Sequence, residues 1–195
     1  MFSRVNQRTN HNLNKSNSYF HIPLRQYTTP SLSNKIKIPE PVKKPIAVMK
    51  WGKPTWYFLH MLAQRVKENE FQNIRDGLLK TIYIVCTNLP CPNCSSHAKQ
   101  YLNKINFNTI ETKRELIKIL FTFHNLVNER KSFPIFSENE LSMYDNINIV
   151  PCINNFMGHF ADKSGSYKLM ANDLHRVRII GQVKTWLQEN LGNFE

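Results

Sequence analysis

The sequence has few cysteines, few glycines and no long apolar run. Four cysteines in 195 residues are too few for a disulfide-stapled secreted scaffold. Six glycines are few for a β-rich protein, and the absence of the pattern G-x-G-x-x-G argues against a Rossmann-type nucleotide site. No run of about eighteen apolar residues is present, so no transmembrane helix is predicted. No apolar segment follows the N-terminal basic residues, which argues against a secretory signal peptide.

Acidic residues are almost absent from the first 50 positions. This segment holds nine Lys or Arg and one acid, Glu40, whereas the whole chain carries a net charge of +12. The segment is rich in Asn, Ser and Pro and has no apolar periodicity, so residues 1–45 are predicted to form a disordered basic arm. This composition leaves open a contact with nucleic acid or an acidic membrane, and also a mitochondrial targeting role.

Helical periodicity begins after Trp51. Pro54 and Thr55 are favourable residues at the start of a helix, and the apolar residues that follow keep helical spacing. A second helix is predicted over residues 71–89, because its apolar stripe continues until Pro90 ends it. The expected core positions of these two helices are Phe58, Leu59, Leu62, Ala63, Val66, Ile74, Leu78, Ile82, Val85 and Leu89.

Local start signals place two more helices after residue 90. Pro92 is suited to the first turn of a helix, which predicts a helix over residues 92–104. Thr112 and Glu115 have the spacing of a capping box, which predicts a helix over residues 112–128. The expected inward face of the latter helix is Ile117, Leu120, Phe121, His124 and Val127.

The last third of the sequence is also helical in pattern. Ser137 and Glu140 repeat the capping-box spacing, and a long helical pattern covers residues 168–191. The apolar stripe expected in that long segment is Val177, Ile180, Val183, Trp186 and Leu187. No alternating strand pattern accompanies these segments, so the predicted fold class is all-α.

Two of the four cysteines, Cys91 and Cys94, are separated by two residues at the start of the third predicted helix. A zinc site with His97 as a third ligand is one interpretation, but zinc usually takes four ligands and the other cysteines, Cys86 and Cys152, are single. A second interpretation is a pair of inert buried thiols. It suits Cys86, which lies on an apolar helix face, better than it suits the pair with its polar and proline neighbours.

A redox-active disulfide is the third interpretation of the C-x-x-C pair. Unpaired N–H groups and the helix dipole at a helix start stabilise a thiolate, which is the form that attacks a disulfide. Two intervening residues allow the sulfur atoms to reach bonding distance. A thioredoxin-like fold also uses this motif, but it requires a βαβ context and the flanks here are helical. An all-α dithiol oxidant therefore needs a further electron acceptor.

Two other stretches, "WGKPTWYFLH" (51–60) and "HNLVN" (124–128), supply motifs for such an acceptor. Together with the cysteine helix "LPCPNCSSHAKQYL" (89–102), and in this order, they resemble the Erv/ALR family of FAD-linked sulfhydryl oxidases over about residues 48–147. The cysteine helix is most similar to the versions carried by large cytoplasmic DNA viruses. The resemblance implies a four-helix bundle with a short fifth helix that binds FAD noncovalently.

The resemblance also implies roles for individual residues. Cys91 and Cys94 match the redox disulfide beside the flavin, with Cys91 taking the attack of the substrate thiolate and Cys94 reacting with the flavin. Helical spacing by itself places His124, Val127 and Asn128 on one face, where they can address one ligand. The residues assigned to FAD by resemblance are Gly52, Lys53, Trp56, His60, Cys94, His124, Asn125, Val127 and Asn128, with Lys131 near the phosphates and Tyr144 as looser matches.

These assignments divide the chain into the basic arm (1–45), an FAD-binding sulfhydryl oxidase domain (46–147) and a helical C-terminal extension (148–195). The implied reaction forms disulfide bonds in thiol-bearing proteins, with electrons passing to oxygen and hydrogen peroxide released. A zinc-binding adaptor and a basic nucleic-acid-binding module are the alternatives. The compartment stays open: cytoplasm or virion for a viral protein, or the mitochondrial intermembrane space if the arm is a targeting signal.

Two departures from the family pattern are visible. Many relatives carry a structural disulfide at places that hold Phe121 and Ser137 here, so apolar packing is expected to replace that disulfide. No second C-x-x-C is present to shuttle electrons. Family members are usually dimers, and the apolar stripe within residues 168–191 needs cover, so a homodimer is expected. This helix is expected either to support the dimer or to dock a substrate protein.

Overall fold

The structure, a computed structural model, describes residues 49–162 and 170–195. The chain divides into Met1–Pro45 and Ile46–Glu195, and the described helices belong to the second of these. The predicted basic arm lies outside the described residues. In chain order the helices are α1 (Gly52–Arg65), η1 (Glu68–Glu70), α2 (Phe71–Thr87), α3 (Pro92–Leu102), η2 (Phe107–Thr109), α4 (Lys113–Arg130), η3 (Glu138–Tyr144), α5 (Ile149–Phe160), α6 (Met170–Asn190) and η5 (Leu191–Asn193), of which the η elements are 3₁₀ helices.

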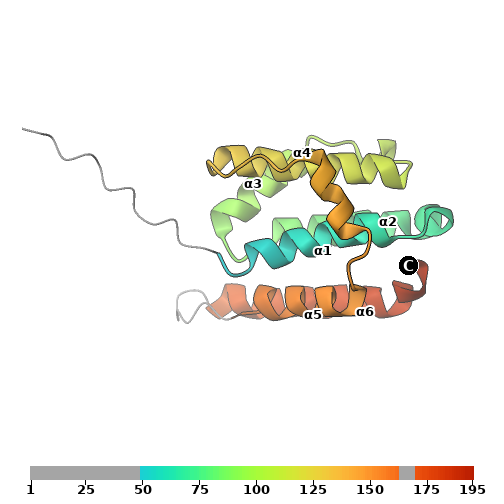
Figure 1. Ribbon diagram of the computed structural model, residues 1–195. Helices are drawn as coiled ribbons and strands as arrows, with labels where there is room; N and C mark the ends of the chain where they lie inside the picture. Colours follow the sequence, from blue (N-terminus) through green and yellow to red (C-terminus); the bar gives the residue numbers. More distant parts are fainter. Residues whose placement is uncertain (1–48, 163–169) are drawn as a thin grey trace, which may run out of the picture. The chain divides into compact units, whose positions relative to one another are not determined.

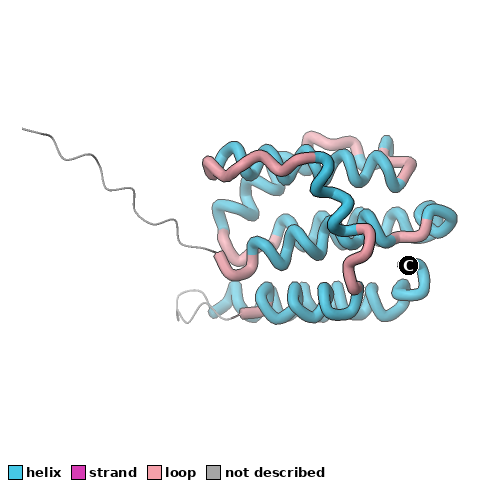
Figure 2. Tube along the Cα trace, viewed as in Figure 1, coloured by secondary structure: helices cyan, strands magenta, loops and turns pink. Residues whose placement is uncertain are grey.

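Helices α1 and α2 form the middle layer of this arrangement (Figure 1). α1 packs against α4 on one side and α5 on the other, and α2 packs against α3 and α6 in the same way. Figure 2 shows helices and loops throughout the described residues, where the β-type pairing is limited to an isolated bridge between Val66 and Phe194. The prediction of an all-α fold is confirmed, and none of the described helices is long and apolar enough to span a bilayer.

The local signals read from the sequence set the helix starts. Pro92 is the first residue of α3. The capping box before α4 is present, because the Glu115 N–H donates to Thr112 Oγ1 at 3.2 Å and the Thr112 N–H donates to Glu115 Oε2 at 2.9 Å. The hydroxyl of Thr55 donates to the carbonyl of Trp51 at 2.7 Å within the first turn of α1. The bonds of the capping box satisfy N–H groups that the start of a helix leaves unpaired.

The buried faces agree with the predicted stripe in α1 and agree only in part in α4, where Leu120 is buried as predicted. All five predicted core residues of the first helical segment are buried, including Val66, which directly follows α1. In α4 the buried apolar residues are Leu116, Leu120 and Phe123, whereas the predicted Phe121 and Val127 are only half-buried. The inward face is rotated because α1 and the aromatic residues it carries contact α4 on the Phe123 side. The half-buried Phe121 instead contacts the ring of Phe136 at 5.9 Å, an apolar contact at one of the two positions where apolar packing was expected.

The predicted stripe of α6 is also shifted. Ile179, Val183 and Leu187 are buried, whereas Val177 is 51% exposed. α6 packs against α2, and Gly77 of α2 lies directly under the indole of Trp186, so that a Cβ at position 77 would overlap Nε1. A glycine here allows the two helices to approach closely. Val183 and Leu187 of the stripe that suggested a second subunit are therefore covered within the same chain, whereas Val177 stays exposed.

The C-terminal segment is joined to α1 by rings and backbone bonds. Phe156 of α5 stacks on Phe58 of α1 with centroids 4.0 Å apart, and both side chains are fully buried. At the end of α1, the Glu195 N–H donates to the Arg65 carbonyl at 2.8 Å and the Lys67 N–H donates to the Asn193 carbonyl at 2.9 Å. One face of α1 is thus occupied by the C-terminal segment, and its other face is turned to α4.

Candidate active site

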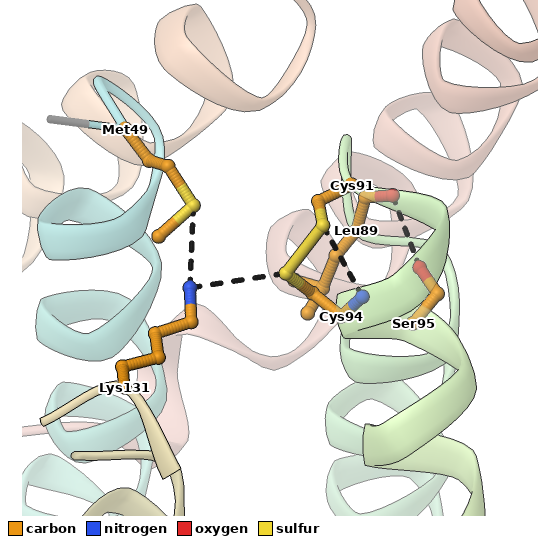
Figure 3. The surroundings of a disulfide bond; sticks show 6 residues. All are labelled: Met49, Leu89, Cys91, Cys94, Ser95 and Lys131. Carbon is orange, nitrogen blue, oxygen red and sulfur yellow. Dashed lines mark hydrogen bonds between the residues drawn. A yellow bond between two sulfur atoms is a disulfide. The ribbon is translucent and has the colours of Figure 1, made fainter. Parts of the chain in front are cut away.

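Cys91 and Cys94 form a disulfide at the start of α3 (Figure 3). Their Cα atoms are 5.1 Å apart, and the N–H of Cys94 donates to Sγ of Cys91 at 3.2 Å. The hydroxyl of Ser95 donates to the carbonyl of Leu89 at 3.0 Å, which fixes the turn before the helix. The pair lies at the positive end of the helix dipole, so a thiolate released when the bond opens is stabilised there.

The other two cysteines are buried thiols. Burial raises the pKa of Cys86 in α2 to about 12 and that of Cys152 in α5 to about 11. Neither forms a disulfide. Because the thiolate is the reactive form, these raised pKa values keep both thiols protonated and unreactive at neutral pH.

The zinc interpretation of the pair finds no support in the described residues. Cys91, Cys94 and His97 do not belong to any cluster of three side chains that could hold a metal ion there. His97 is exposed on α3, and the two cysteines are bonded to each other. The basic arm, on which the nucleic-acid-binding alternative depends, lies outside the described residues.

A cavity of about 570 Å³ lies beside the disulfide and is walled mainly by α1, α4 and the segment that follows α4. Cys94 is part of its wall. A volume in this range suits a ligand of drug or cofactor size. The structure brings together at this cavity most of the residues assigned from the sequence: Gly52, Lys53, Trp56, Cys94, His124, Val127, Asn128, Lys131 and Tyr144.

Three assigned residues are not on the cavity wall. Cys91 lies behind Cys94, and His60 is fully buried behind the wall. Asn125 holds the loop after α4, because its Nδ2 donates to the Phe136 carbonyl at 2.9 Å and its Oδ1 accepts from the Phe136 N–H at 2.8 Å. Asn125 thus positions a ring of the wall without facing the cavity itself.

Aromatic rings form one side of the cavity. Trp56 of α1 stacks on His124 of α4 with centroids 4.0 Å apart, and Phe136 stacks on the other side of His124 at 4.9 Å. Phe123 and Phe136 also line the cavity, although neither was assigned from the sequence. The helical spacing of Leu116, Leu120 and Phe123 could have identified Phe123, whereas no local signal marks Phe136.

Two histidines meet behind this wall. Nε2 of His60 and Nδ1 of His124 are 3.1 Å apart. Burial lowers the pKa of His60 to about 3, with a further contribution from His124, and burial lowers the pKa of His124 to about 4. Both rings are therefore neutral at pH 7. Since a neutral imidazole has one N–H, one ring donates and the other accepts in this bond.

This pair predicts an acid-sensitive stability. The pKa of each histidine is lower in the folded chain than in the unfolded chain, so the unfolded chain binds more protons as the pH falls below about 6.5. The free energy of unfolding should fall by about 1.4 kcal/mol per pH unit for each histidine between pH 6 and 5. Urea unfolding at several pH values in this range measures the slope of the free energy of unfolding against pH. In His124→Gln this slope is expected to be about half that of the wild type.

The exposed His97 supplies the control for this measurement. His97→Gln removes a histidine from the surface of α3 and should leave the slope of the wild type unchanged. Equal slopes in the wild type and in His124→Gln would contradict the buried neutral pair.

The charges around the cavity are mainly positive. Lys53, Arg130 and Lys131 line it, and Glu140 is the acid among its described lining residues. The ammonium of Lys131 points between two sulfur atoms, 3.8 Å from Sγ of Cys94 and 3.3 Å from Sδ of Met49 (Figure 3). Aromatic faces combined with several cations suit a planar ligand that carries anionic groups.

Comparison with known proteins agrees with this site. Residues 53–146 match the model of the Erv1/Alr family. The chain is 31% identical over 100 residues to the FAD-linked sulfhydryl oxidase of African swine fever virus (isolate Tick/Malawi/Lil 20-1/1983), which covers 51% of this chain and 81% of the viral protein. It is 27% identical over 91 residues to the mitochondrial FAD-linked sulfhydryl oxidase erv1 of Schizosaccharomyces pombe, covering 46% of this chain and 50% of the yeast protein.

The extent of these matches differs among relatives. Protein 096R of Invertebrate iridescent virus 3 is 29% identical over 85 residues, which is 43% of this chain and 57% of that protein. The chain thus spans about half of the length of the iridescent virus and yeast relatives, and most of the length of the swine fever virus protein. No solved structure matches the chain significantly. The family model covers the disulfide and most of the cavity-lining residues, the viral relative is matched over most of its own length, and the chain belongs to the Erv1/Alr family.

Proposed function

We propose that this protein is an FAD-linked sulfhydryl oxidase that forms disulfide bonds in thiol-bearing substrate proteins. The observation that carries the proposal is the position of Cys94, which is bonded to Cys91 and at the same time lines the large cavity. A redox disulfide on the wall of a cofactor-sized cavity allows electrons to pass directly from sulfur to a bound cofactor. The names of the viral and yeast relatives support the same activity.

The residues of the cavity fit FAD. The stacked rings of Trp56 and His124 offer flat surfaces for an aromatic ligand, and Lys53 and Arg130 offer positive charge for a pyrophosphate. Asn128, which is buried in the last turn of α4, supplies an amide for hydrogen bonds. Bound FAD would supply a two-electron acceptor for the reduced cysteine pair, and its reoxidation by oxygen would release hydrogen peroxide.

The cysteine pair carries out the thiol chemistry. A substrate thiolate attacks Sγ of Cys91, a bond forms between these two sulfurs, and the bond to Cys94 breaks with its electron pair left on Cys94. A second substrate thiolate then attacks the substrate sulfur of the mixed disulfide and releases Cys91 as a thiolate. The substrate leaves oxidised, and the pair has gained two electrons. Cys91 is the attacked sulfur in this scheme because Cys94 faces the cavity.

Residues behind the cavity hold its wall in place. Asn125 fixes the backbone of Phe136, and His60 accepts or donates the single hydrogen bond to His124 that orients the latter ring. Burial, together with the nearby Tyr57, Glu140 and Cys152, raises the pKa of Tyr144, so its hydroxyl stays protonated at neutral pH. These groups position the wall and exchange no protons in the neutral range.

The oligomeric state remains a prediction. The expected homodimer rests mainly on family resemblance, since α2 of the same chain packs against α6 and covers Val183 and Leu187 of the predicted stripe, although Val177 stays exposed. Sedimentation of the full-length protein at micromolar concentration measures it directly.

The proposed activity predicts a yellow protein that consumes oxygen. Full-length protein should be purified with visible flavin absorbance, and it should consume oxygen and release peroxide when a dithiol is added. A colourless preparation, or a flavin-loaded protein that consumes no oxygen with dithiol, would count against the proposal.

A further inference from the structure

Lys131 is the described cation that touches the disulfide. Its Nζ is 3.8 Å from Sγ of Cys94 and 3.3 Å from Sδ of Met49, and the close-up shows the side chain reaching from the end of α4 towards both sulfurs (Figure 3). The sequence resemblance assigned this lysine loosely to the phosphates of the cofactor. The structure instead places its ammonium beside the sulfur atom that faces the cavity.

The backbone around Lys131 is fixed by the end of α4. Its N–H donates to the carbonyls of Val127 and Asn128, each at 3.1 Å. The next residue, Ser132, has a φ of 56°, and the N–H of Phe133 turns back to the Asn128 carbonyl at 2.9 Å. A left-handed residue just after the last turn, with bonds back to the final carbonyls, is a standard helix end. The backbone of Lys131 is therefore held in a defined position by the helix end, and its side chain extends from there.

The surroundings of the ammonium strengthen its effect on sulfur. Lys131 is half-buried, and among the described residues no ion pair joins it to a carboxylate. Burial, followed by the charge of Arg130, lowers the pKa of Lys131. A partly desolvated charge acts through a lower effective dielectric than a surface charge does, so its influence on a neighbouring thiolate is larger.

We propose that the ammonium of Lys131 stabilises the thiolate of Cys94 when the disulfide opens. The proposal rests on the proposed function, in which attack on Cys91 leaves an electron pair on Sγ of Cys94. A positive charge at 3.8 Å lowers the energy of that leaving group and of the reduced pair relative to the disulfide. Lys131 is then a catalytic residue for the thiol exchange, in addition to the helix start that both cysteines share.

The size of the effect follows from the distance. An opposite charge within about 4 to 6 Å typically lowers the pKa of an acid by about 1 to 3 units. Removing it should raise the pKa of the Cys94 thiol by about 1 to 2 units. The same tenfold to hundredfold change in equilibrium would make the reduction potential of the pair more negative by about 30 to 60 mV. The helix dipole remains in the variant, so part of the thiolate stabilisation should persist.

The test isolates Cys94 as a free thiol in the full-length protein. In a Cys91→Ser background, the rate of alkylation of Cys94 by iodoacetamide is followed against pH by mass spectrometry, which gives the thiol pKa without any turnover. Lys131→Met and Lys131→Gln remove the charge in two different ways, and Lys131→Arg keeps it. Lys118→Met removes an exposed lysine from the same helix, far from the disulfide, as the matched control.

The expected result is a pKa of Cys94 raised by about 1 to 2 units in Lys131→Met and Lys131→Gln, and unchanged in Lys131→Arg and Lys118→Met. A glutathione titration of the otherwise wild-type pair should give the matching shift in potential. An unchanged thiol pKa in a folded charge-removing variant would overturn the proposal. Because alkylation needs no oxidase activity, a shifted pKa in a protein that consumes no oxygen would uphold the role of Lys131 while defeating the proposed function.

Discussion

Cys94→Ser is expected to abolish oxidation of a dithiol, with a loss of at least about a thousandfold in rate. Cys91→Ser should do the same. Two sulfur atoms joined in a disulfide are needed to accept two electrons from a substrate, and a single cysteine leaves no disulfide for the substrate thiolate to attack. Oxygen consumption with a dithiol substrate measures the loss.

The cavity should survive these two substitutions. Serine is close to cysteine in size, and the cavity is walled mainly by α1 and α4, so flavin absorbance per mole of protein is expected to stay at the wild-type level. Cys152→Ala provides the matched control, because this thiol is buried in α5, does not line the cavity and forms no disulfide, so its loss should not affect the rate. Normal oxygen consumption by Cys91→Ser or Cys94→Ser would remove the disulfide from the mechanism.

Phe156→Ala should lower the free energy of unfolding by about 3 to 5 kcal/mol. The ring is fully buried, stacks on Phe58 at 4.0 Å and contacts Phe160 at 5.1 Å, so its removal leaves a cavity between α5 and α1. Urea denaturation followed by circular dichroism measures the change.

Val150→Ala on the same helix is the control for Phe156→Ala. Val150 is 54% exposed, and the substitution is expected to change stability by no more than about 0.5 kcal/mol. A loss below about 1 kcal/mol for Phe156→Ala would mean that α5 unfolds separately from α1 and α2, in which case the C-terminal segment would not belong to the same cooperative unit.

Much of the secondary structure follows from local chemistry that the sequence displays. The proline at the start of α3 and the capping box before α4 act within a few residues, so they could be located without knowing the packing. The three cavity residues of "HNLVN", His124, Val127 and Asn128, could also be grouped from helical spacing alone. Each of these features depends on residues within one helix.

The features that the sequence could not provide depend on how elements meet. α4 and α6 each offer two adjacent apolar arcs, and the partner helix decides which one is buried, so Phe123 replaced Phe121 and Ile179 replaced Val177. The contact between Lys131 and Cys94 joins residues 37 positions apart, and no pattern within either segment indicates it. The placement of α5 and α6 on α1 and α2 likewise depends on shape, including the approach of Trp186 at Gly77.

The connection between α1 and the C-terminal segment has a consequence for biosynthesis. The side chain of Lys67 donates to the carbonyl of Gly192, 125 residues further along, and Phe58 needs Phe156 to be covered. A ribosome adds about 5 to 20 residues per second, so α1 emerges on the order of ten seconds before the segment that completes its packing. During that interval its apolar face is open to other nascent chains and to chaperones. The time for which a new molecule exposes the apolar face of α1 is therefore set by the rate of translation rather than by the rate of folding.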